Sequence, residues 1–139
     1  MISLLAGTVL LTTIAQTPEN GQLADYFGFQ DMAVIPIGDK PGPMLVTDLN
    51  ADGLDDIVVA NNHRSRIEIL QQRAGASPND PITPPRDINE FSDHWRYERI
   101  LVPVSDAVAA IAAYDFDGDG LKDLLTGGPP GRITFLRQT

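Results

Sequence analysis

The chain has 139 residues, a length that suits one domain, and it contains no cysteine. The lack of cysteine excludes disulfide bonds, a thiolate nucleophile and a cysteine-ligated zinc site. With 10 basic and 19 acidic residues, the formal charge is −9. This charge argues against a nucleic-acid or anionic-membrane partner, because both require a basic surface. The acidic residues are either spread over a solvated surface or concentrated where they hold cations.

The N-terminal residues 2–15 read ISLLAGTVLLTTIA and carry no charged side chain. This run is too short to span a membrane as a helix, but it has the length of the apolar region of a signal peptide. The small residues before Gln16 and the loop-like residues 17–21 favour a secretory signal peptide over residues 1–15. The missing basic residue near the start leaves a buried strand or helix as the alternative. We therefore expect a protein that is secreted, periplasmic or at the cell surface.

The sequence contains an internal repeat of two copies. Residues 46–58 (VTDLNADGLDDIV) and residues 113–125 (AYDFDGDGLKDLL) align without a gap at an offset of 67. The flanking apolar runs also match, and with one residue fewer in the second turn, RIEIL at 66–70 aligns with RITFL at 132–136. A repeat of this length is a whole structural unit rather than a coincidence of two acidic loops.

The runs around the acidic loops predict β-strands. They are short, rich in Val, Ile and Leu, and bounded by Gly, Asn and Asp. Residues 66–69 alternate polar and apolar side chains, as in a half-buried strand. Further strands are expected over 26–29 and 32–37 before the first loop and over 95–104 before the second, so that each repeat has about four strands. The expected division is a first repeat at 24–71, a Pro-rich loop or linker at 72–92, and a second repeat at 93–139.

The acidic loops have the spacing of a calcium site. Oxygen-bearing side chains stand at the first, third, fifth and ninth positions, and glycine at the sixth permits a sharp turn. The backbone carbonyl of the seventh residue, a leucine in both loops, supplies a further oxygen. The expected ligands are Asp48, Asn50, Asp52, Leu54 and Asp56 in one loop, and Asp115, Asp117, Asp119, Leu121 and Asp123 in the other. Two bound Ca²⁺ ions would change the formal charge from −9 to −5.

Other readings of these loops fit less well. A single Asp-rich stretch is often only a turn, but two copies with matched flanks favour calcium. An EF-hand or a dockerin loop needs a glutamate at the twelfth position, where this chain has Val59 and Thr126. The run Asp115–Gly118 is similar to the nucleophile motif of haloacid-dehalogenase-type phosphatases, but the other copy lacks it.

The two loop segments, DLNADGLDDI and DFDGDGLKDL, resemble the FG-GAP or VCBS-type repeats of integrin-α-like β-propellers. The resemblance implies an all-β fold of two four-stranded antiparallel blades, in which the loop joins the first two strands and calcium pins that hairpin. It also implies that Asp55 and Lys122, at the eighth position, point to solvent. Two blades do not close a propeller ring. The chain is then part of a longer propeller, an assembly with itself or with further blades, or a small sandwich, and we favour the first two.

The resemblance implies a secreted or cell-surface module for adhesion or for protein or carbohydrate recognition, with structural calcium and no catalysis. The alternative is a fragment or accessory domain of an extracellular hydrolase; a calcium buffer or sensor is a weaker one. The isolated histidines His63 and His94 are more typical of surface or turn residues than of a catalytic base. Trp95 and Tyr97 are either core residues of a strand, which we favour, or a sugar-stacking patch.

Overall fold

The computed structural model describes residue 28 and residues 33–85 and 87–139. The predicted signal peptide at 1–15 lies outside the described residues, as does the strand expected over 26–29 apart from its glycine. Residues Ile35–Thr139 form one compact unit, which carries both acidic loops.

The described part of the chain contains seven strands and no helix. The runs of β-branched and leucine residues form the strands, and the Gly-, Asp- and Asn-rich segments between them form the turns. The all-β class predicted from the sequence is therefore confirmed. The strands are β1 (Pro41–Thr47), β2 (Asp56–Asn61), β3 (Arg66–Gln72), β4 (Tyr97–Pro103), β5 (Ala110–Tyr114), β6 (Asp123–Gly128) and β7 (Arg132–Leu136).

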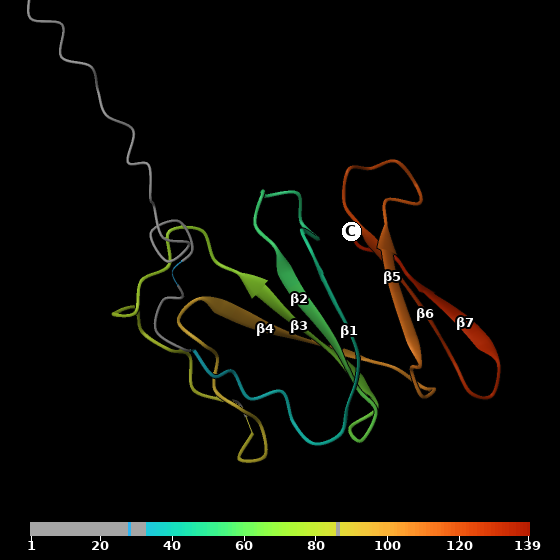
Figure 1. Cartoon of the computed structure of the whole chain (residues 1–139), viewed down its shortest axis with the longest axis horizontal. Coiled ribbons are helices and arrows are strands. Elements are labelled where there is room, and N and C mark those ends of the chain that lie inside the picture. The colour runs from blue at the N-terminus through green and yellow to red at the C-terminus, as the bar shows by residue number, and fades with distance from the viewer. Residues whose placement is uncertain (1–27, 29–32, 86) are drawn as a thin grey trace, which may run out of the picture. The chain divides into compact units, whose positions relative to one another are not determined.

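The strands form two antiparallel sheets that repeat each other in register. The first sheet has the order β1-β2-β3-β4 and the second the order β5-β6-β7 (Figure 1). In the first sheet Leu45, Val58 and Ile69 lie opposite one another. The same places in the second sheet are held by Ala112, Leu125 and Phe135. These pairs differ by the sequence offsets of the repeat, so the internal repeat is also a structural one.

The strand expected over 95–104 lies in a different sheet from the one predicted. The repeat pattern predicts that it belongs to the second repeat, but β4 pairs with β3 along its whole length, from Arg66 opposite Pro103 to Gln72 opposite Tyr97. Apart from Gln72, which ends β3, the Pro-rich segment 72–92 is thus part of the connection between β3 and β4 inside the first sheet. The second sheet has three strands among the described residues, instead of the four that were expected.

Residues 33–37 form no strand, contrary to the expectation for 32–37, of which Met32 is not described. Pro36 has no N–H with which to join a ladder. The carbonyl groups of this segment instead accept side-chain hydrogen bonds from the first sheet. Arg99 Nη2 donates to Pro36 O at 2.7 Å, and Asn61 Nδ2 donates to Ile37 O at 3.4 Å.

The core lies between the two sheets. Leu49, Val58, Ile67 and Leu124 are buried together, and they bring residues from both acidic-loop hairpins into one cluster. The partly buried residues packed around them are Leu45, Ile69, Val102, Val104, Ile111, Ala113 and Leu136. Asn62 adds a polar link, because its side chain donates to Val108 O at 2.9 Å and accepts from Val108 N at 2.7 Å.

The side of the first sheet that faces away from this core carries a buried charged cluster. Glu68 is fully buried, although the alternating pattern of 66–69 predicted that its side chain would face solvent. Its carboxylate accepts hydrogen bonds from Asn61 Nδ2 at 2.8 Å, from Arg66 and from Arg99. The β3–β4 connection reaches the same cluster, since Arg66 pairs with Glu90 at 3.3 Å. This long connection therefore covers the side of the first sheet that faces away from the core, where Glu68 would otherwise be exposed to solvent.

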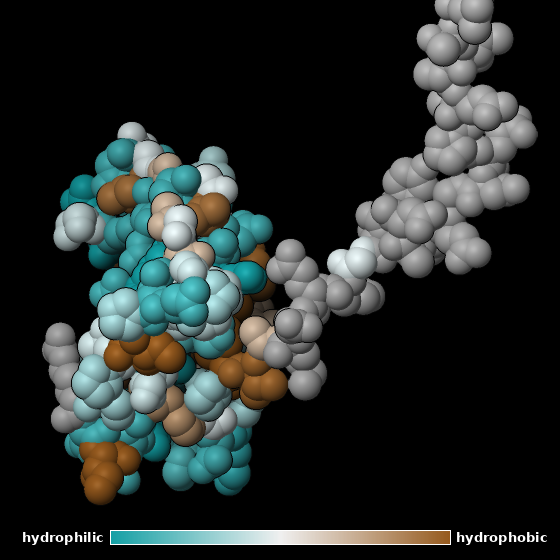
Figure 2. Space-filling view, turned by 90° about the vertical axis from the view of Figure 1, so that its left-hand side faces the viewer, coloured by the Kyte–Doolittle hydropathy of each residue, from teal (hydrophilic) through white to brown (hydrophobic). Residues whose placement is uncertain are grey.

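The face of the molecule in Figure 2 is mostly hydrophilic, with its hydrophobic residues in separate groups. Within the described residues, no helix is long and apolar enough to cross a membrane.

Candidate metal centre

The two acidic loops occupy equivalent positions in the fold. Residues 48–55 connect β1 to β2, and residues 115–122 connect β5 to β6, so each loop closes the first hairpin of its sheet. The glycine at the sixth position has a positive φ in both, 85° at Gly53 and 92° at Gly120. The fourth residues, Ala51 and Gly118, also lie in the left-handed region, at 60° and 78°. The sequence prediction of a sharply curled loop in a β-hairpin is confirmed.

The same hydrogen bonds shape both loops. The first carboxylate accepts from the sixth backbone N–H, at 3.0 Å for Asp48 and Gly53 and at 3.0 Å for Asp115 and Gly120. The fifth carboxylate accepts from the seventh N–H, at 2.8 Å for Asp52 and 2.9 Å for Asp119. The third side chain accepts from the fifth N–H at 3.2 Å in each loop. These bonds direct the side chains of alternate residues toward the inside of one turn.

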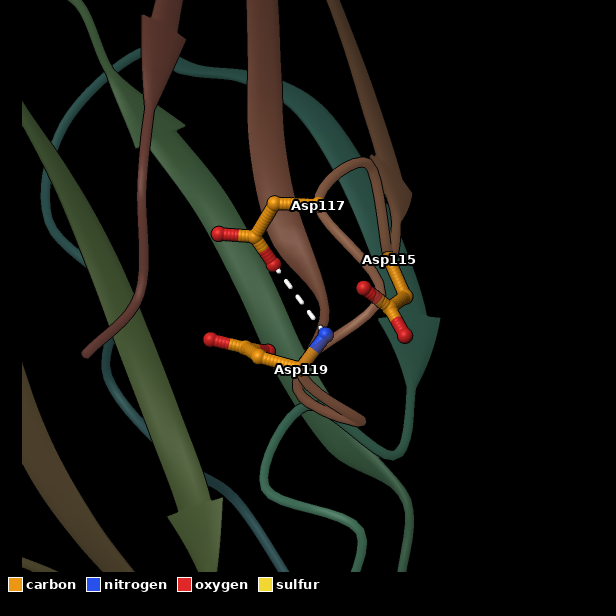
Figure 3. A group of neighbouring side chains, drawn as sticks. All are labelled: Asp115, Asp117 and Asp119. Carbon is orange, nitrogen blue, oxygen red and sulfur yellow. Dashed lines mark hydrogen bonds between the residues drawn. The ribbon is translucent and has the colours of Figure 1, made fainter.

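The second loop brings three carboxylates together. Asp115, Asp117 and Asp119 each place one oxygen so that the three lie within 4.8 Å of one another (Figure 3). Oxygens bound to one calcium ion at about 2.3–2.6 Å are at most about 5 Å apart. The spacing and the all-oxygen donor set of this loop therefore fit a calcium ion.

The first loop has one carboxylate fewer, because its third position is Asn50. The Asn50 side chain donates to Asp52 Oδ2 at 2.9 Å while its own oxygen accepts from Asp52 N at 3.2 Å. Asp48 Oδ1 accepts from the same N–H at 3.2 Å, so the side chains of Asp48 and Asn50 share one backbone donor. Three of the five expected ligand residues, Asp48, Asn50 and Asp52, are thus linked to one another by hydrogen bonds.

The ninth-position aspartates are buried and bonded to the backbone. Asp56 accepts from Leu49 N at 3.0 Å and from Gln72 N at 2.8 Å. Asp123 makes the equivalent bonds to Phe116 N at 3.3 Å and Gln138 N at 2.9 Å. Each carboxylate thereby ties the start of its loop to the end of the third strand. The group of three carboxylates in the second loop does not include Asp123, so its expected role as a ligand stays a prediction.

The seventh and eighth residues of the two acidic loops have the burial expected from the sequence, with the exception of Lys122. Leu54 and Leu121 are half-buried, as expected for apolar side chains turned inward, and Asp55 is exposed. The expectation that Lys122 points to solvent is wrong. Its Nζ donates to Thr47 Oγ1 at 2.6 Å, and its N–H donates to Leu49 O at 3.1 Å. The second loop therefore binds directly to the end of β1.

Arg137 is a residue of this site that the sequence did not indicate. Its Nε lies 2.5 Å from Asp117 Oδ2, and its Nη2 lies 4.0 Å from Asp119 Oδ2. The single positive charge of the guanidinium thus offsets part of the negative charge of the three clustered carboxylates, mainly at Asp117. In the repeat alignment Arg137 stands where the first unit has Gln71, and a lone basic residue after a strand carries no signal of a metal loop.

Trp95 lies beside the first loop rather than in a strand. It lines a surface pocket with Asp52 and Leu54, and the Arg96 guanidinium stacks over its ring at 4.8 Å. The His94 ring lies 5.2 Å away on a tilted plane. Burial and the charge of Arg96 lower the pKa of His94, and its Nδ1 accepts from Arg96 N at 3.2 Å. His63 is exposed in the β2–β3 turn.

Comparison with known proteins agrees with this geometry. The FG-GAP-like repeat family matches residues 48–126, which is more than half of the chain and includes both loops. No curated protein and no solved structure matches the chain significantly. The structure agrees with a match to a repeat family. Its two acidic loops lie in equivalent hairpins, and the strands of these hairpins pair in the same register. The chain therefore belongs to the FG-GAP-like repeat family.

Proposed function

We propose that this protein is a secreted or cell-surface calcium-binding repeat module for adhesion or for protein or carbohydrate recognition. The observation that carries the proposal is the equivalence of the two loops, which share position, spacing and hydrogen bonds. In this proposal calcium has a structural role and the chain is not an enzyme, because catalysis rarely requires the same site twice.

Electrostatics support the proposal of bound cations. Like charges a few ångströms apart repel each other, so a cation bound among the three carboxylates would relieve their mutual repulsion. Arg137 does this in part for the second loop. The carboxylate and carbonyl oxygens of the loops are the ligands that calcium prefers. Bound calcium would stiffen two hairpins whose first strands, β1 and β5, are in contact across the sheets.

The partner in this proposal is an extracellular protein or a carbohydrate. A formal charge of −9 disfavours nucleic acid and anionic lipid as partners, also after two calcium ions have bound. The second class of partner is further blades, supplied by another copy of this chain or by a different protein. Such blades would pack against the two sheets, which do not close a ring.

Calcium titration of the purified protein tests the proposal. We expect two sites by calorimetry, with a rise in melting temperature on adding calcium. Each site should stabilise the folded state by about 2.7 kcal/mol when free calcium is 100-fold above its dissociation constant. Magnesium at the same concentration is the control, and it should stabilise much less because it demands a strict octahedral geometry. A melting temperature that does not respond to calcium would contradict the proposal.

Trp95 allows the two sites to be told apart. It is the single tryptophan of the chain, and it shares a pocket with Asp52 and Leu54 of the first loop. Calcium binding to the first loop should change its fluorescence. The substitution Asp48→Ala should abolish this change, whereas Asp115→Ala in the second loop should leave it in place.

Removing Arg137 should strengthen calcium binding to the second loop. The guanidinium and the cation compete for Asp117, so Arg137→Gln should raise the affinity of this loop up to about fivefold, the range for an exposed ion pair. Calorimetry in the Asp48→Ala background isolates the second loop. Arg132→Gln is the matched control, because Arg132 pairs with Asp106 and has no contact with the loop carboxylates. An affinity that falls in the Arg137→Gln protein would mean that Arg137 orders the loop for calcium instead of competing with it.

A further inference from the structure

The repeat leaves the second sheet with an uncovered apolar side. In the first sheet Leu45, Val58 and Ile69 face the second sheet and pack in the core. The equivalent residues of the second sheet, Ala112, Leu125 and Phe135, face away from that core. We call this side the open face, and its residues are Ala112, Tyr114, Phe116, Leu125, Ile133 and Phe135.

The open face carries large exposed hydrophobic side chains. Ile133 is 73% exposed, Tyr114 is 66% exposed and Phe135 is 47% exposed. Phe116 joins the aromatic residues, with its ring centroid 5.4 Å from that of Tyr114 and 5.6 Å from that of Phe135. A contiguous apolar surface of this kind on a folded domain marks a contact site rather than a solvated surface.

The chain also exposes the counterpart of this face. Within the chain, Ile111, Ala113 and Leu124 of the second sheet are the residues that pack onto the first sheet. Their equivalents in the first sheet are Met44, Val46 and Ile57. Met44 is 62% exposed and Val46 is 52% exposed, while Ile57 is half-buried. We call Met44, Val46 and Ile57 the rear face. It lies on the β1–β2 half of the sheet, next to the half that holds the Glu68 cluster.

We propose that a second copy of this chain docks on the open face through its rear face. The contact would repeat, between two molecules, the contact that the first and second sheets already make within one molecule. The occupant is a second copy because one chain presents both halves of this contact and leaves both exposed. No residue of either face is acidic, so the net charge of −9 does not oppose the contact at its centre.

The proposed contact joins different surfaces of two identical molecules. Such a head-to-tail contact does not stop at a dimer; repeated, it builds a ring or an open filament. In either form each added copy contributes two more sheets, and the apolar side chains of all inner copies are covered. This inference rests on the second class of partner in the proposed function, and it names that partner. It does not depend on calcium in the loops, so a failed calcium titration and a failure to associate can be told apart.

Light scattering after size exclusion, with the full chain in calcium and in EDTA, tests the inference. We expect the mass to increase with concentration beyond a dimer. Phe135→Glu damages only the open face and Val46→Glu only the rear face, so each variant alone should be monomeric, with association weakened at least about 30-fold. Ile88→Glu is the control, because Ile88 is 96% exposed in the β3–β4 connection, outside both faces, and it should associate like the parent.

Mixing the Phe135→Glu and Val46→Glu variants tests whether the contact is head-to-tail. Each variant keeps the face that the other has lost, so the mixture should form a one-to-one complex that grows no further. Circular dichroism should be the same for all variants, which excludes loss of folding as the cause. A parent that stays monomeric would overturn the inference. So would a Val46→Glu protein that still associates through two open faces.

Discussion

Replacing Glu68 by glutamine is expected to remove about 3–5 kcal/mol of the free energy of unfolding, the range for breaking a buried ion pair. Glu68 is fully buried, and the Arg99 side chain that pairs with it is 5% exposed. Without the carboxylate, the positive charges of Arg66 and Arg99 remain in the protein with no buried counter-charge. Because the whole stability of a domain is about 5–15 kcal/mol, the variant should melt far below the parent.

Urea unfolding followed by circular dichroism measures this loss. Glu98→Gln is the matched control, since Glu98 lies on the neighbouring strand β4 with an exposed side chain, and its substitution should stay within about 0.5 kcal/mol of the parent. The double variant with Arg99→Gln should lose less than the sum of the single losses, because the two side chains contact each other. A Glu68→Gln protein as stable as the control would show that the cluster is open to water.

Replacing Asp56 by asparagine should destabilise the protein even in EDTA, by about 2–4 kcal/mol. Both oxygens of the buried carboxylate accept backbone hydrogen bonds, one from Leu49 and one from Gln72. An asparagine side chain puts an NH₂ group against one of these N–H donors. The loss combines a charged hydrogen bond, about 1.5–3 kcal/mol, with a donor left unsatisfied. Asp123→Asn should have a similar effect in the second sheet.

Melting curves with and without calcium separate the two roles of these aspartates. Asp55→Asn is the control, because Asp55 is the exposed neighbour in the same loop and should leave both curves unchanged. Suppose instead that Asp56→Asn melts like the parent in EDTA and loses only the calcium response. The carboxylate would then act mainly as a ligand, and its bonds to the backbone would contribute little.

The features that the sequence predicted correctly are local or repeated. Each acidic loop is shaped by hydrogen bonds between residues two to five positions apart, so its curl can be read from spacing alone. The hairpins follow from short apolar runs on both sides of such loops. The offset between the two copies also predicts equal registers in the two sheets, as in the pairs of Val58 with Ile69 and of Leu125 with Phe135.

Tertiary packing overruled the local pattern at other places. β4 follows a connection of more than twenty residues, and nothing in its own sequence says whether it pairs with β3 or with the second sheet. Glu68 reads as a solvent-facing residue of an alternating strand, yet the connection that carries Glu90 covers it. Lys122 reads as an exposed loop residue, yet it reaches Thr47, 75 positions earlier in the chain.

The sequence by itself determined the all-β class, the two hairpin loops and the curled conformation of each loop. Hydrogen bonds and side-chain spacing within one turn depend on only a few dihedral angles, which glycine and aspartate specify locally. Only the tertiary structure decided which sheet β4 joins, which carboxylates Arg137 pairs with, and which apolar side of the second sheet is exposed. These depend on contacts between residues far apart in the chain, where burial and charge pairing, rather than local conformation, select the partner.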